Sequence, residues 1–206
     1  SGAFFVKQST CWYWNGDYGD TVDDAGYLEL FARWYQWEAF LPIFRGHGTD
    51  CRRELWYYEG EKQMFFNAIL AANRLRYHLM PYIYSQAGRV WLKDESMMKM
   101  LAFDFAEDTN VLDIRDEYLF GDSFLVCPVT EPMYYEAGNK QLAERSYTRR
   151  VYLPQGCGWY DYWTNDYYQG GQWLEAEAPI DKMPLFVRAG SIIPMTDSLS
   201  HISVKD

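Results

Sequence analysis

Apolar residues recur at helical spacing near the start of the chain, between Phe31 and Leu41. Their i, i+3, i+4 pattern predicts a helix that buries a wide stripe, and Pro42 is expected to end it. The pair Ile43-Phe44 then predicts a short buried strand, which leads into the polar tip Arg45-Gly46-His47-Gly48. Helix, strand and polar tip are typical of a repeating α/β unit. In barrels built from such units, residues at the C-terminal ends of the strands form the active site.

A second helical pattern runs from Glu61 to Arg89, with a break or kink expected at Pro81 because proline lacks a backbone donor. The apolar run from Met97 to Phe105 follows and predicts a buried strand. The fold class expected for this first part is therefore α/β.

From about Glu107 the pattern changes to short β-rich runs separated by Gly, Pro and Asn turns, which favours an antiparallel sandwich. We place a domain boundary near residues 106–110. This division gives an α/β domain over residues 1–106 and an all-β domain over residues 107–206. The predicted strands are Phe124 to Val129, Thr148 to Leu153, Leu185 to Ala189 and Ile192 to Pro194.

The composition of the chain favours some classes of function and argues against others. Aromatic residues make up 19% of the chain, with nine Trp and eighteen Tyr. Aromatic faces stack on sugar rings, although Trp and Tyr also serve as ordinary packing residues. The formal net charge of −10 argues against a nucleic-acid partner, which requires a basic surface.

Four cysteines are widely spaced and lack the paired spacing of a zinc site, so we expect no metal and no cofactor. Disulfides are left open. No apolar run reaches the ~20 residues of a membrane span, so no membrane partner is expected. The first residues lack the features of a signal peptide and there is no initiating methionine, which suggests an incomplete piece. The compartment is therefore not predicted, and a periplasmic or secreted location stays open.

The segment FARWYQWEAFLPIFRGHGTDCRRELW, residues 31–56, resembles the signature of glycoside hydrolase family 31, approximately R-W-x-Q-x-G-A-F-x-P-x-x-R-x-H-G followed by R-E-x-W. Glu38 stands where the signature has glycine. The resemblance continues through Arg76 to Tyr84, and segments 118–132 and 147–195 resemble the β-sandwich that follows the barrel in this family. The later segments look closest to bacterial α-xylosidases.

The resemblance implies which residues bind sugar. His47 would hydrogen-bond hydroxyls of the −1 subsite, and Phe4, in the segment Gly2 to Val6 that resembles a family D-I-G-G-F loop, would line the pocket. Arg45 would orient the site or form an internal salt bridge. Taken alone, a single histidine is more often a structural residue than a ligand-binding one.

Retaining glycosidases need two carboxyl groups about 5–5.5 Å apart. The family places its nucleophile aspartate and its W-x-G-D acid earlier in the barrel, so no catalytic residue is assigned within this chain. Trp14-Asn15-Gly16-Asp17 imitates the acid motif but follows the segment that it should precede. Asp17 is therefore interpreted as a turn residue.

The resemblance thus implies the C-terminal part of a (β/α)₈ barrel, with Met97 to Phe105 as its last strand, followed by an antiparallel β-sandwich. The resemblance implies a piece of a retaining α-glycosidase that removes α-linked xylose from xyloglucan-type oligosaccharides, with the oligosaccharide as partner. An α-glucosidase fragment and a non-catalytic carbohydrate-binding module are the alternatives. The isolated chain is expected to be inactive, and its oligomeric state is not predicted.

Overall fold

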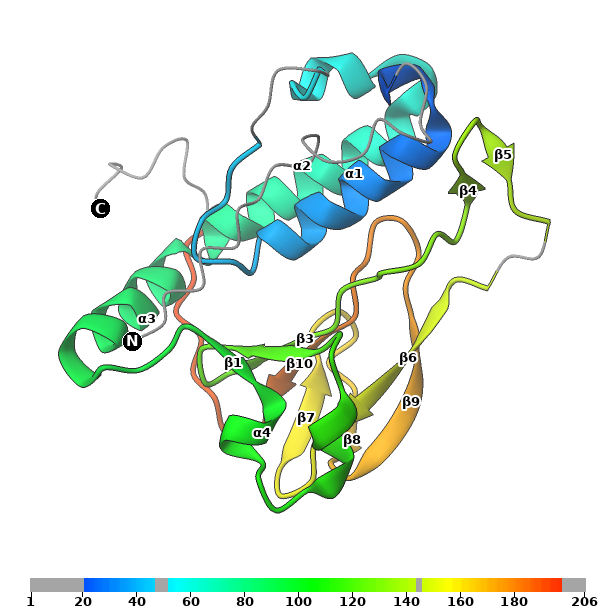
Figure 1. The fold of residues 1–206 in the computed structure, drawn as a ribbon. Helices are drawn as coiled ribbons and strands as arrows, with labels where there is room; N and C mark the ends of the chain where they lie inside the picture. The colour runs from blue at the N-terminus through cyan, green and yellow to red at the C-terminus, as the bar shows by residue number, and fades with distance from the viewer. Residues whose placement is uncertain (1–20, 47–51, 144–145, 198–206) are drawn as a thin grey trace.

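The computed structural model describes residues 21–46, 52–143 and 146–197, which form a helical layer above antiparallel β-structure (Figure 1). The helices and 3-10 turns are η1 Thr21–Asp23, α1 Ala25–Glu38, η2 Leu55–Tyr58, η3 Gly60–Lys62, α2 Gln63–His78, α3 Met80–Lys93, α4 Leu101–Asp104 and η4 Thr109–Asp113. No helix within these residues has the length and apolar composition needed to cross a membrane.

All strand pairs among the described residues are antiparallel. The larger sheet has the order β1-β2-β3-β10-β7-β8, and β4-β5 and β6-β9 form two separate pairs. The strands are β1 Met98–Met100, β2 Tyr118–Phe120, β3 Phe124–Val126, β4 Tyr135–Glu136, β5 Lys140–Gln141, β6 Thr148–Leu153, β7 Gly158–Asp161, β8 Tyr167–Gln169, β9 Gln172–Glu177 and β10 Leu185–Arg188.

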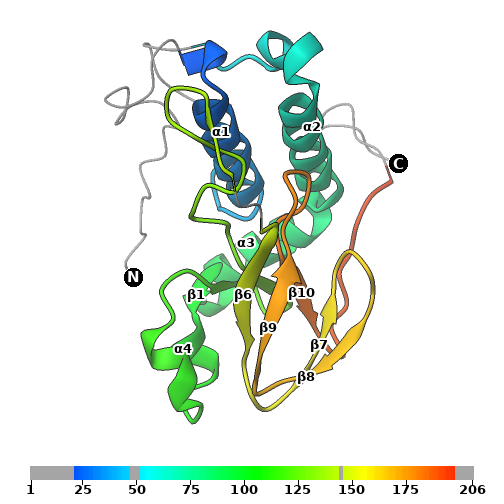
Figure 2. The same cartoon turned by 90° about the vertical axis from the view of Figure 1, so that its right-hand side faces the viewer.

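Helices α1 and α2 lie side by side and run in the same direction (Figures 1 and 2). Their starts are joined by the Lys62–Asp23 ion pair, with 2.7 Å between Nζ and Oδ1. Their ends are joined by Arg76, which donates to the Ala39 carbonyl over 2.9 Å. The chain between them must therefore return along the length of α1 before α2 begins.

Local signals explain where the helices begin and end. Asp24 caps α1 by accepting from the backbone N–H groups of Gly26 and Tyr27. The helix ends at Glu38, ahead of Pro42 as predicted. The predicted break near Pro81 is confirmed as the junction between α2 and α3, which falls at Leu79 because proline is accepted in a helical first turn.

In the described part of the chain, three apolar clusters make up the core. One lies within the β-structure around Trp159, one joins α1, α2 and Ile180, and the third packs the end of α1 and the start of α3 against β2, β3 and β10. In the third cluster Phe40 meets Phe120 and Phe124 edge to face, with centroid separations of 5.9 and 5.5 Å. Because two clusters span the helical layer and the β-structure, the two layers share one core.

A polar face of α1 supplies the second link between the layers. Glu29, Arg33 and Gln36 are buried, and their spacing places them on one side of the helix. Glu29 accepts hydrogen bonds of 2.8–2.9 Å from three successive backbone N–H groups, those of residues 133–135. Arg33 donates to the carbonyls of Ala178, Pro179 and Lys182, and Gln36 donates to that of Ile180.

Three strand predictions differ from the structure: two of the predicted runs form no strand, and the third forms a shorter one. Ile43-Phe44 forms no strand and Ile43 is exposed, because no described strand lies beside it to pair with. Residues 192–194 are likewise irregular, with Ile192 exposed. Of the run from Met97 to Phe105, only Met98–Met100 is a strand; the next four residues form α4 and leave Phe103 exposed. The side-chain pattern suited a strand, but pairing decides whether one forms.

Strand β1 pairs with β2, so it belongs to the antiparallel sheet rather than to a barrel. The strand predicted at Thr148 to Leu153 is confirmed over its whole length, and those starting at Phe124 and Leu185 are confirmed but shorter. Trp34 and Trp37 are only half-buried, whereas Phe40 is fully buried.

Replacing Arg33 by Met tests the polar face of α1. The variant R33M keeps most of the side-chain volume but removes the Arg33 donor from three carbonyls, and the nearby positive charge from Glu29. We expect a loss of about 3–5 kcal/mol in the free energy of unfolding, measured by urea titration. The exposed Arg74 of α2 is the matched control, and R74M should change that value by less than about 0.5 kcal/mol. Equal effects of the two substitutions would contradict the assigned role.

Glu38 predicts a pH dependence of stability. Its carboxyl is fully buried, neither oxygen has a hydrogen-bond partner in the described residues, and burial raises the pKa of Glu38 to about 8. The folded chain therefore holds a proton that the unfolded chain releases near pH 4.5, so stability falls as the pH rises from about 4.5 to 8 and then levels off.

The variant E38Q isolates this effect. It should flatten the pH profile of the unfolding free energy and be more stable than the parent above pH 8, by on the order of 3–5 kcal/mol. Burial also raises the pKa of Glu117, to about 7, so a smaller slope should persist in both proteins. Parallel profiles for parent and variant would show that Glu38 is not held protonated.

Candidate functional site

Of the three predicted sugar-binding residues, the structure places one. Arg45 lies near the end of the segment that follows α1, with its side chain exposed and without an ion pair in the described part of the chain. Phe4 and His47 lie outside the described residues, as do Asp17 and two of the cysteines. Their predicted roles remain predictions.

Buried Arg76 of α2 positions the segment that carries Arg45. Its guanidinium donates to the carbonyls of Ala39, Leu41 and Pro42 over 2.9, 2.6 and 3.2 Å. Burial lowers the pKa of Arg76 to about 10, so it remains charged at neutral pH. In the sequence Arg76 stood out only as part of the family resemblance from Arg76 to Tyr84, and its three carbonyl acceptors now give it a structural role.

Phe44, directly before Arg45, is also held. Its ring lies 5.8 Å from the Arg76 guanidinium carbon and packs edge to face on Tyr35 with centroids 4.8 Å apart. The backbone leading to Arg45 is therefore fixed by α1 and α2 together. A binding residue presented from this segment has its position set by the two helices, without strand pairing.

Two acidic residues between α4 and β2, Asp108 and Asp116, are engaged in structural contacts. Asp108 accepts hydrogen bonds from the Tyr152 hydroxyl, the Gln155 N–H and Asn110. Asp116 pairs with Arg149. Burial alone would raise the pKa of Asp108, but these hydrogen bonds outweigh it and hold the pKa below its usual value.

A cavity of about 460 Å³ opens between α3, the β2–β3 turn and the residues after β10. The sequence did not point to this cavity, because three separate segments form its walls. They are separated along the chain by about 35 and about 70 residues. It is lined by Tyr82, Ser85, Gln86, Arg89, Asp122, Ser123, Arg188, Ala189, Gly190, Ser191, Ile192 and Pro194.

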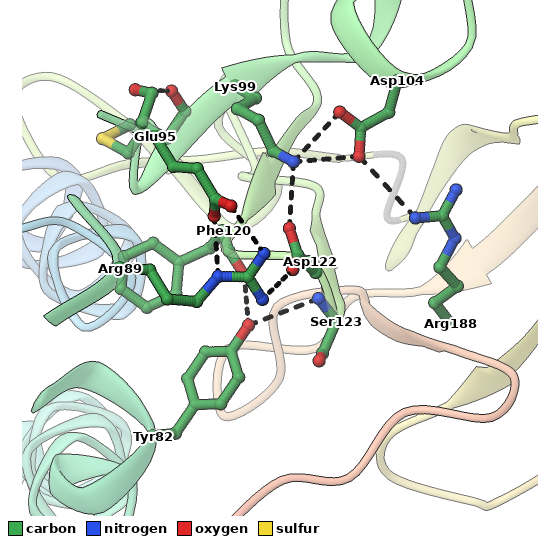
Figure 3. Close-up of polar contacts among 11 residues, drawn as sticks. Tyr82, Arg89, Glu95, Lys99, Asp104, Phe120, Asp122, Ser123 and Arg188 are labelled. Carbon is green, nitrogen blue, oxygen red and sulfur yellow. Dashed lines mark hydrogen bonds and ion pairs between the residues drawn. The ribbon is translucent and has the colours of Figure 1, made fainter. Parts of the chain in front are cut away.

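A network of charged side chains borders this cavity (Figure 3). Arg89 pairs with Glu95 and with Asp122, and Lys99 bonds both Asp122 and Asp104. Burial would raise the pKa of Asp122, but the bond and charge of Lys99 and the charge of Arg89 bring it below its usual value. Asp122 is thus ionised at neutral pH, so it can accept hydrogen bonds but is not a proton donor.

Tyr82 shapes the floor of the same region. Its hydroxyl donates to the Phe120 carbonyl over 2.8 Å and accepts from the Ser123 N–H over 3.3 Å. Gly121, at the intervening turn, has φ +61°, and a Cβ there would come within 2.2 Å of the Tyr82 oxygen. Only glycine permits this close approach of the turn to α3.

Metal chemistry finds no support in the described residues, where no cluster of three His, Cys, Asp or Glu side chains could hold an ion. Cys127 and Cys157 are free thiols. The described side chains around the cavity therefore offer hydrogen-bonding groups and a network of paired charges.

Comparison with known proteins identifies the family. The Glycosyl hydrolases family 31 TIM-barrel domain matches residues 4–86, and the Glycosyl hydrolase family 31 C-terminal domain matches residues 94–193. An alpha-xylosidase of Saccharolobus solfataricus is 38% identical over 89% of this chain and 24% of its own length. Human neutral alpha-glucosidase C is 37% identical over 81% of this chain and 17% of its own length.

A solved structure agrees with these matches. The family 31 alpha-xylosidase of Xanthomonas citri superimposes with a TM-score of 0.72 at 46% identity, over 82% of this chain and 17% of that enzyme. Other solved relatives hold a pentasaccharide substrate or isomaltotriose. The chain spans about a quarter or less of the length of the curated relatives described here. It belongs to glycoside hydrolase family 31.

Proposed function

We propose that this chain is part of a retaining α-glycosidase that removes α-linked xylose from xyloglucan-type oligosaccharides. The observation that carries the proposal is the 46% identity to an alpha-xylosidase of known structure over 82% of the chain. Human neutral alpha-glucosidase C at 37% identity keeps an α-glucosidase as the alternative. The pentasaccharide and isomaltotriose held by solved relatives support an oligosaccharide as the partner class.

In fold terms, we infer that α1 and α2 are consecutive outer helices of a (β/α)₈ barrel and that the strands after them form a β-sandwich. Consecutive helices of such a barrel run parallel, as α1 and α2 do (Figure 2). The division at residues 106 and 107 stays a prediction. The pairing of β1 with β2 favours a boundary earlier in the chain, between Lys93 and Met98.

The mechanism assigned to this chain is substrate binding. His47 would donate a ring N–H to hydroxyls of the sugar at the cleaved bond, and Phe4 would line the same pocket. Arg45, presented by the segment that Arg76 holds, would orient the site. Such hydrogen bonds accelerate hydrolysis where they strengthen as the ring distorts toward the transition state. The two catalytic carboxylates are proposed to lie upstream of residue 1.

The test uses the longer polypeptide encoded by the reading frame that extends upstream of residue 1. It should hydrolyse p-nitrophenyl α-xyloside with a higher kcat/KM than p-nitrophenyl α-glucoside, whereas residues 1–206 alone should show only background hydrolysis. The reverse preference would favour the α-glucosidase alternative. Hydrolysis by residues 1–206 that is lost on replacing one of their own acids would overturn the assignment of the catalytic pair.

Within the longer protein, His47→Ala should lower kcat/KM by roughly 10²–10³-fold, because it removes a hydrogen bond that acts mainly in the transition state. His78→Ala is the matched control: His78 contacts the Thr196 carbonyl at the end of α2, and its loss should change kcat/KM less than about threefold. A wild-type kcat/KM in the His47 variant would remove His47 from the site.

A further inference from the structure

Gln86 has a largely buried side chain whose carboxamide forms no hydrogen bond to the described residues. It lies on α3 and is 8% exposed, and neither its oxygen nor its nitrogen bonds to any described residue. Its carboxamide is pressed against Gly121, where an added Cβ would come within 2.7 Å of Cδ. The amide atoms of Gln86 still reach solvent, so they are open to a ligand with hydrogen-bonding groups. Since Gln86 lines the cavity, the group that satisfies it can enter from there.

The other polar groups of the cavity wall can also form hydrogen bonds with a ligand that enters the cavity. The hydroxyls of Ser85, Ser123 and Ser191 come from three different segments around the cavity, while Ile192 and Pro194 add an apolar wall. A volume of about 460 Å³ lies in the range of roughly 300–1,000 Å³ that is usual for small-molecule pockets. Hydroxyls and an amide can both donate and accept, which suits a ligand with several hydroxyl groups.

The charges of the wall favour a neutral ligand. Arg89 and Asp122 are joined in an ion pair, and their side chains remain 36% and 35% exposed. Arg188 is tied to Asp104 over 3.6 Å and lies over the Phe105 ring. Each charge in the network of Figure 3 has an opposite charge beside it, so an ionic ligand would have to displace an existing pair. A neutral ligand can accept from Arg89 and donate to Asp122 while the pair stays intact.

We propose that this cavity binds a neutral polyhydroxylated ligand, a sugar unit, through the Gln86 carboxamide, Arg89 and Asp122. The proposal goes beyond the function proposed above, because it concerns residues of α3 and the β2–β3 turn that the family signature does not include. It also stands without any hydrolytic activity. A carbohydrate chain held here would be retained by the protein without being cleaved at this position.

The experiment is a titration of the 206-residue chain with D-xylose and D-glucose, followed by proton–nitrogen correlation spectra. The Gln86 side-chain NH₂ signal, assigned by its absence in Gln86→Met, should move in a saturable way at millimolar sugar. Inorganic phosphate is the charged probe and should leave that signal in place. Saturable shifts with phosphate alone, or no shift with either sugar, would overturn the proposal.

Gln86→Met removes the amide while keeping an unbranched side chain of similar size. Sugar affinity should fall at least roughly tenfold, the effect of losing one hydrogen bond to a ligand. The urea midpoint should stay the same or rise, because the amide has no protein partner to lose. Gln63→Met is the matched control, since Gln63 is an exposed helical glutamine whose side chain donates to Asn67; it should leave affinity unchanged.

The stability measurement separates this role from a structural one. If the Gln86 amide served the fold, Gln86→Met would lower the urea midpoint, and that outcome would contradict the proposal. Ser191→Ala provides a second variant at the opposite wall and should weaken sugar binding by severalfold without a change in the urea midpoint. Unchanged sugar affinity in both variants would also overturn the proposal. Failure here leaves the hydrolysis test of the longer protein unaffected.

Discussion

The described structure depends on how one helix satisfies the backbone of two distant loops. Helix α1 buries Glu29, Arg33 and Gln36, and these side chains bond the N–H groups of residues 133–135 and the carbonyls of residues 178–182. Backbone groups buried in loops have no ladder partners, so side chains must supply them. Side chains of α1 therefore complete the β-structure by supplying hydrogen-bond partners for its loop backbone. The apolar clusters that the two layers share lie beside these bonds.

The same constraint gives a physical meaning to part of the family signature. Arg33 and Gln36 belong to the motif that led from the sequence to glycoside hydrolases, yet in the structure they hold loops of the C-terminal half of the chain. Arg76 has a corresponding role for the segment that leads to Arg45. The family signature thus includes residues whose role is structural: they hold together the loops and the segments from which the predicted binding residues extend.

Features set by local sequence were predictable. The helical spacing after Glu61 and the proline at position 81 specify their elements locally, whereas the predicted strand at Thr148–Leu153 forms over its whole length because all six residues pair with β9. Ile43-Phe44 and residues 192–194 have equally apolar patterns but form no strand, since a strand needs a neighbour that composition does not supply. The buried state of Glu29 was also not evident, because its partners are backbone groups more than 100 residues away.

The two candidate sites also differ in whether the local sequence predicts them. Arg45 could be nominated from the sequence because its motif is contiguous, although the structure alone shows that α2 holds its segment. The cavity around Gln86 could not be found from spacing, because a glutamine on an amphipathic helix has the pattern of a surface residue. Its burial depends on Gly121, and the charges beside it come from β1, α4 and β10.

Native-state hydrogen exchange tests most directly whether α1 and the β-structure form one cooperative unit. The account predicts that the interior amides of α1, the amides of residues 133–135 and those of β3 and β10 open with the same free energy. It also predicts that the variant E29Q lowers that free energy equally for all of them. If the amides of β3 and β10 keep their protection while α1 and residues 133–135 open at a much lower free energy, the claim that α1 completes the β-structure is wrong.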